Sequence, residues 1–214
     1  MPSELLRLLE VMNRLRSPGG CPWDAEQTHQ SLIKYLLEES YEFIDSVEEN
    51  DRQAMREELG DILLQVYFHS RIAQEHPTDP FSIEEVAAGI ADKLIRRHPH
   101  VFGETRVESS EEVLQNWEKL KAAEKNRTSA TDGVALSQPA LPLITKLLYR
   151  AEKNGINLDL PTTDMNNDVP AEIAIGDALV AAVAAAIKQG IEPEDLLRAR
   201  AREISEEIKR IESL

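Results

Sequence analysis

Two consecutive stretches, 31–49 and 52–75, constrain the fold most, because apolar residues recur in both with helical spacing. Asn50 and Asp51 mark a turn between them, and His76-Pro77 ends the second stretch. Glycine and aromatic residues are few in the chain, whereas Glu, Leu and Ala are abundant, and no stretch shows a convincing alternation of β-branched residues. The sequence therefore predicts an all-α protein.

The remaining helices are expected over 3–16, 82–97, 110–125, 141–153, 173–188 and 193–211. Residues 126–140 lose the helical periodicity and predict a linker. A polar, proline-containing loop is expected over 157–169. The predicted organisation is a helical-bundle domain over 1–125 and a smaller helical region over 141–214.

The net charge of -15 opposes sequence-independent binding to nucleic acid or to anionic membranes, since both require a basic surface. The longest apolar run, 178–187, is too short to span a bilayer, and no N-terminal series is typical of a signal peptide. A single cysteine, Cys21, excludes an internal disulfide and a cysteine-based zinc site. We therefore expect a cytoplasmic protein.

Four acids occupy matching positions on the two central stretches. Glu39 and Glu42 are three residues apart, as are Glu58 and Asp61, so each pair lies on one helix face. If the two helices fold back antiparallel about Asn50, all four carboxylates can meet. A spacing of about 100° per residue places Glu39, Glu58 and Asp61 beside the apolar stripes. Such a set of like charges is unfavourable unless cations neutralise it, and oxygen ligands favour Mg²⁺, with Mn²⁺ second.

The alternative is a solvated acidic face, because Glu-x-x-Glu is common on helices. Gly60 favours a site to a small extent. A glycine inside a helix is about 1 kcal/mol less favourable than alanine, so its place beside Asp61 suggests close approach by another helix or a ligand.

Several motifs in series resemble the MazG family over about residues 5–125. They are Cys21-Pro22-Trp23-Asp24 with Gln27-Thr28-His29, the two acidic pairs, the run from Arg97 to Gly103, and Asn116-Trp117-Glu118 with Lys121. The resemblance implies an all-α nucleoside triphosphate pyrophosphohydrolase that forms a homodimer or a higher oligomer. It further implies that Glu39, Glu42, Glu58 and Asp61 hold Mg²⁺ on the triphosphate. The products would be a nucleoside monophosphate and pyrophosphate.

Further roles come from the same resemblance. Glu38 matches the acid that activates the attacking water, although an ordinary surface glutamate is an equal alternative. Lys93 and Arg97 match family positions, whereas Arg96 is a candidate from its place on the same helix. The candidates for binding the substrate are therefore Lys93, Arg96, Arg97, Trp117, Lys121, Trp23, Gln27 and His29. Arg suits paired hydrogen bonds to phosphate, whereas the indole of Trp117 could stack on any base. The alternatives without a role in substrate binding are that Arg96 balances the negative charge of the chain and that either tryptophan packs in the core. For His98 and His100, which flank Pro99, we expect a role in capping a helix or in packing.

The C-terminal region resembles a second MazG domain that has lost its site. Residues 175–179 match 59–63 around a shared Gly-Asp pair, but Ala174 stands where Glu58 would be. We therefore expect Asp177 to lie in a degenerate, non-catalytic region. Two rivals remain for the whole chain. A di-iron bundle would need Glu-x-x-His on two helices, and only Glu26-x-x-His29 is present. The other is a non-catalytic helical interaction protein with a structural cation site.

Overall fold

The computed structural model describes residues 3–124, 128–162 and 169–213, and the regular structure in these ranges is entirely helical. The helices are α1 (Glu4–Arg16), α2 (Pro22–Glu26), α3 (His29–Glu48), α4 (Arg52–Ala73), α5 (Ile83–Arg97), α6 (Pro99–Phe102), α7 (Ser110–Glu124), α8 (Ala140–Lys153), α9 (Ala171–Lys188) and α10 (Pro193–Glu212). The prediction of an all-α fold is confirmed. The chain divides into two compact units, Met1–Glu118 and Lys119–Leu214.

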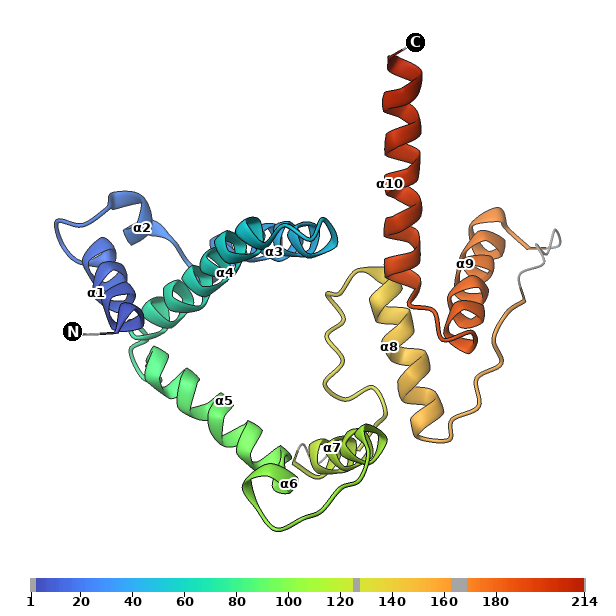
Figure 1. Ribbon diagram of the computed structural model, residues 1–214, viewed down its shortest axis with the longest axis horizontal. Coiled ribbons are helices and arrows are strands. Elements are labelled where there is room, and N and C mark those ends of the chain that lie inside the picture. Colours follow the sequence, from blue (N-terminus) through green and yellow to red (C-terminus); the bar gives the residue numbers. More distant parts are fainter. Residues whose placement is uncertain (1–2, 125–127, 163–168, 214) are drawn as a thin grey trace. The chain divides into compact units, whose positions relative to one another are not determined.

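Helices α3 and α4 pack against each other as an antiparallel hairpin, the most extensive helix pair of the first unit (Figure 1). Thr28 and Ser31 form a capping box that starts α3. Asn50 turns the chain with a left-handed φ of 56°, and Asp51 then caps α4 by accepting from the backbone N–H groups of Gln53 and Ala54. Local sequence therefore fixes where each helix of the hairpin begins.

The core of the first unit lies where α1 crosses the open end of the hairpin. Met12, Leu32 and Phe68 are almost fully buried there, one each from α1, α3 and α4. Arg16 ends α1 and donates to both carboxylate oxygens of Glu75, at 3.2 and 2.8 Å. This ion pair fastens the C-terminal end of α1 to the segment that follows α4.

Helix α5 starts at a capping box between Ser82 and Glu85, near the end of α4, and extends away from the hairpin (Figure 1). His98 ends it by donating its backbone N–H to Leu94 and Ile95, and its ring lies 5.1 Å from that of Trp117 on α7. The cap and packing role expected for His98 is confirmed. Pro99 then begins the single turn of α6.

The second unit gathers α8, α9 and α10 around small side chains. Ala151, Ala174, Ala181, Val183 and Ala184 are buried between these helices. Of the loop expected over 157–169, residues 157–162 are not helical, and 163–168 lie outside the described ranges. None of the described helices is long and apolar enough to cross a membrane.

The structure departs from the expectations in two ways. Helices α2 and α6 fall where only breaks and turns were expected, because a proline at the first helical position starts each short helix. The second difference concerns the apolar stripes of α3 and α4. Ile33, Leu37 and Leu59 are each 53% exposed, so part of each stripe is uncovered among the described residues.

Candidate metal and nucleotide site

The hairpin brings three of the four expected ligands together. One carboxylate oxygen from each of Glu39, Glu58 and Asp61 lies within 4.8 Å of the others, and all three side chains are half-buried. Asn50 at the turn explains the meeting, because Glu39 and Asp61 are equally distant from it along the chain. The expected edge-of-core position of these three acids is confirmed.

Glu42 and Glu38 lie at the margin of this cluster. Both are exposed on α3. The charge of Glu42 acts on Glu58, and the charge of Glu38 acts on Glu39. The fourth expected ligand is therefore next to the other three, although it is outside the tight group of oxygen atoms.

The electrostatics of the cluster are those of crowded like charges. Partial burial raises the pKa of Glu39, and repulsion from Asp61, Glu42, Glu38 and Glu58 raises it further. Burial likewise raises the pKa of Glu58, followed by the charges of Glu42 and Asp61. Within the described part of the chain, every charge that raises these pKa values is a carboxylate. A hard divalent cation fits this donor set, since it removes the repulsion and accepts oxygen ligands.

His29 lies at the open end of the same hairpin and pairs with a residue that sequence reasoning missed. Its Nδ1 lies 2.8 Å from Nδ1 of His69 on α4, and the two rings are nearly parallel. Burial and the nearby His29 lower the pKa of His69. The turn position brings the start of α3 to the end of α4, which limits the partner of His29 to that region but places residue 71 directly opposite it.

Gln27 and Trp23 occupy the segment before α3. The Gln27 amide donates to the carbonyl of Trp23 at 2.9 Å and accepts from the Ser31 hydroxyl at 2.7 Å. Trp23 is half exposed, and its ring meets the edge of Tyr35 at 6.0 Å. The indole is therefore a surface group, and the alternative of a core anchor does not describe it.

The basic candidates of α5 lie on a different part of the first unit. Lys93 is half-buried, Arg96 exposed and Arg97 buried, all near the C-terminal end of α5. Because α5 extends away from the hairpin, one chain does not bring this end to the acids (Figure 1). Trp117 and Lys121 are half-buried on α7, one helical turn apart. The acids and the basic residues at the end of α5 are thus two separate groups within the first unit.

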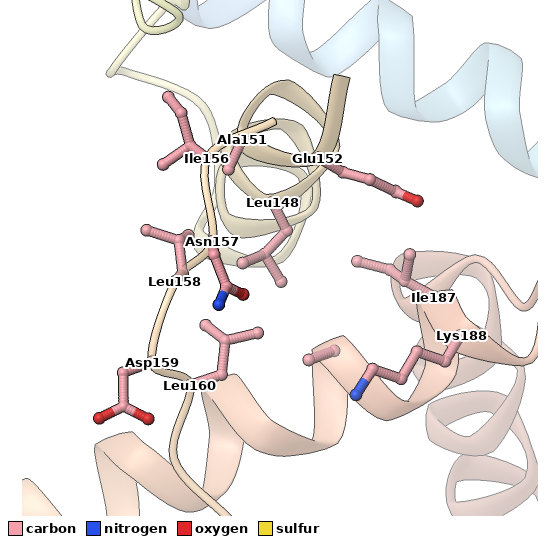
Figure 2. A pocket seen from close by; sticks show the side chains of 11 residues that line it. Leu148, Ala151, Glu152, Ile156, Asn157, Leu158, Asp159, Leu160, Ile187 and Lys188 are labelled. Atoms are coloured by element: carbon pink, nitrogen blue, oxygen red, sulfur yellow. The ribbon is translucent and has the colours of Figure 1, made fainter. Parts of the chain in front are cut away.

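The second unit contains a cavity of about 1040 Å³ between α8, α9 and residues 156–160 (Figure 2). Leucine, isoleucine and alanine side chains share its lining with polar and charged ones, and the carboxylates of Glu152 and Asp159 point in different directions. Among the described residues, the group around Glu39 is the one acidic cluster with metal-ligand spacing. Asp177 of α9 does not belong to such a group.

The chain is similar to proteins of the MazG family. The model of the MazG nucleotide pyrophosphohydrolase domain matches residues 27–102, which include all the acids and the end of α5 but neither tryptophan. A Thermotoga maritima protein named nucleoside triphosphate pyrophosphohydrolase/pyrophosphatase MazG is 36% identical, over 97% of this chain and 85% of its own length.

Two further relatives extend the similarity. A 26.1 kDa Streptomyces cacaoi protein is 45% identical over 93% of this chain and 78% of its own length. The Escherichia coli K12 nucleoside triphosphate pyrophosphohydrolase is 43% identical over 72% of this chain, which spans 60% of that protein.

Proposed function

Because this chain belongs to the MazG family, we propose that it hydrolyses nucleoside triphosphates to a nucleoside monophosphate and pyrophosphate with Mg²⁺ at the α3–α4 hairpin. The observation that carries the proposal is the meeting of Glu39, Glu58 and Asp61, whose oxygen atoms lie within 4.8 Å of one another. The names of the Thermotoga maritima and Escherichia coli relatives supply the substrate class.

The acids divide the chemistry between them. Glu39, Glu42, Glu58 and Asp61 hold Mg²⁺, and Mn²⁺ as a substitute, because four carboxylates offer only oxygen ligands. The bound cation would neutralise charge on the phosphate oxygens. Glu38, exposed one position before Glu39, accepts a proton from the water that attacks the triphosphate. The hairpin thereby fixes cation and proton acceptor on one rigid element.

Substrate binding requires the basic residues. Lys93, Arg96 and Arg97 bind phosphate oxygens, while Trp117 with Lys121 and the Trp23–Gln27–His29 segment contact the nucleoside side. In one chain the C-terminal end of α5 is remote from the acids. We therefore propose that a second copy brings its basic groups to the acidic cluster, so the active form is a homodimer or a higher oligomer.

Uncovered apolar surface supports this assembly. On α3 and α4, Ile33, Leu37 and Leu59 are each 53% exposed, and on α5 Ile90 and Leu94 are 46% and 42% exposed. Isolated exposed leucines are ordinary, but stripes on three consecutive helices are typical of an interface. Packing against a second copy would bury these exposed apolar side chains.

The direct test is to incubate the full chain with a nucleoside triphosphate and Mg²⁺ and to separate the products by anion exchange. Nucleoside monophosphate and pyrophosphate in equal amounts are expected, and EDTA should abolish both. Nucleoside diphosphate with phosphate would refute the proposal. Mg²⁺ binding without turnover of any tested nucleotide would instead support a non-catalytic protein with a structural cation site. The cytoplasmic location expected from the sequence stays a prediction.

A further inference from the structure

Helix α10 carries an apolar stripe that the rest of its unit leaves uncovered. The helix contacts α8 and α9, and most of its length projects beyond them (Figure 1). Leu197, Ile204, Ile208 and Ile211 are each at least half exposed. Together with Ala201, they follow alternating steps of four and three residues, which is the heptad spacing of a coiled coil. This spacing predicts that a second helix packs against the stripe.

The charged residues on both sides of the stripe indicate which helix packs against it. Arg200 and Glu207 border one side, and Arg198, Ser205 and Glu212 border the other. If two copies of α10 lay parallel, Glu207 would face Glu212 of the partner subunit. In an antiparallel pair, Arg200 faces Glu207 of the partner subunit, and this contact occurs twice about the two-fold axis. Charge complementarity therefore selects the antiparallel arrangement.

The core layers over 197–208 agree with the same register. Ala201, the smallest residue of the stripe, lies opposite Ile204 of the partner subunit, and Leu197 lies opposite Ile208 of the partner subunit. Each layer pairs an a position with a d position, and the central layers pair a small side chain with a large one. Arg200 and Glu207 now bind Glu203 and Arg210 of their own helix, and both are exposed enough to exchange these partners.

We propose that α10 is a self-association surface that pairs with α10 of a second copy as an antiparallel coiled coil. The proposal is independent of catalysis, because it involves no residue of the hairpin or of α5. It assigns the C-terminal unit a role in joining chains.

Cysteine cross-linking of the full chain tests the pairing. In a Cys21→Ser background, Ala201→Cys and Ile204→Cys chains are prepared separately, mixed and oxidised, with Glu206→Cys on the opposite face of α10 as the control. The mixed disulfide between positions 201 and 204 should exceed either disulfide between like chains. Dominant 201–201 and 204–204 disulfides would indicate a parallel pair and overturn the proposal. A yield no higher than the Glu206→Cys control would also overturn it and would assign the stripe to another surface, such as the first unit.

Charge exchange provides a second readout on the same mixture. Arg200→Glu in both chains should lower the yield of the mixed disulfide about fivefold, because two attractive contacts become repulsive. Arg200→Glu in one chain with Glu207→Arg in the other restores opposite charges at both contacts, so the yield should recover. Equal yields in the two mixtures would contradict the antiparallel register.

Discussion

Glu39 and Glu58 oppose folding of the metal-free chain when they are ionised. Both pKa values lie above the usual 4.5, so the folded state binds these protons more tightly than the unfolded chain does. Their stabilising contribution is present below the unfolded pKa and is lost as pH rises through the folded values. At neutral pH the two groups therefore weaken the fold until a cation or a neutral substitution removes the repulsion.

The first prediction is that Glu58→Gln raises Tm in EDTA at pH 7, whereas the wild-type chain gains the same benefit only on acidification or on addition of Mg²⁺. The variant should show a much smaller rise of Tm with Mg²⁺. Differential scanning fluorimetry across pH 5–8 measures both effects. Glu10→Gln, an exposed change on α1, should alter neither. A fall of Tm in Glu58→Gln without metal would show that this carboxylate stabilises the free protein.

Gly60 offers a second test at the residue scale. A side chain at position 60 would meet no atom within 4 Å in this chain, and the same holds for Gly89 on α5. A neighbouring helix of the same chain therefore does not require the glycine. Both Gly60→Ala and Gly89→Ala should raise the free energy of unfolding by about 0.5–1 kcal/mol, which chemical denaturation measures. Only Gly60→Ala should lower activity, because only position 60 adjoins the acids. Equal activity in the two variants would show that Gly60 has no role in the site.

At the scale of elements, Arg16 and Glu75 fix α1 against the end of α4. Arg16 also donates to the carbonyls of Asp24 and Gln27, the latter at 3.1 Å, so it holds the segment that carries Trp23. The guanidinium hydrogen bonds and charge of Arg16 hold the pKa of Glu75 below its usual value, although burial acts in the opposite direction. This pair contributes stability above the unfolded pKa of Glu75 and loses it as pH falls through the folded value.

Glu75→Gln should therefore destabilise the chain by about 1 kcal/mol at pH 7, a small value because Glu75 is partly exposed. The difference from wild type should shrink as pH falls through the lowered pKa of Glu75, below which both chains carry a neutral group at this position. Urea unfolding at several pH values measures the difference. A gap that stays constant with pH would mean that packing, rather than charge, links α1 to α4.

Most elements of this fold follow from local signals. Ser3, Thr28, Asp51 and Ser82 cap helices near the expected positions, and the acids meet because two helices share one turn. The short helices α2 and α6 were missed because four or five residues are too few to show a period. The direction of α5 depends on packing between helices, so sequence reasoning could not place Lys93 or Arg97 relative to the hairpin.

At the scale of the whole molecule, the account requires more than one chain. Native mass should be at least twice the 24.1 kDa of the monomer, as measured by sedimentation velocity. Leu94→Glu, within the exposed stripe of α5, should shift the chain towards monomer and reduce turnover. Ala88→Glu introduces the same charge on the other side of α5 and should do neither. A fully active monomer would contradict the proposal that a second copy completes the site.

The central claim is that each chain has one functional acid set, centred on the α3–α4 hairpin. The sequence offers a matched pair for its test, because Gly60-Asp61 and Gly176-Asp177 can receive the same substitution. Steady-state release of pyrophosphate should fall by about 100-fold or more in Asp61→Asn, since a proposed metal ligand is lost. Asp177→Asn should keep nearly the turnover of wild type. Unchanged turnover in Asp61→Asn, or a large loss in Asp177→Asn alone, would contradict the account.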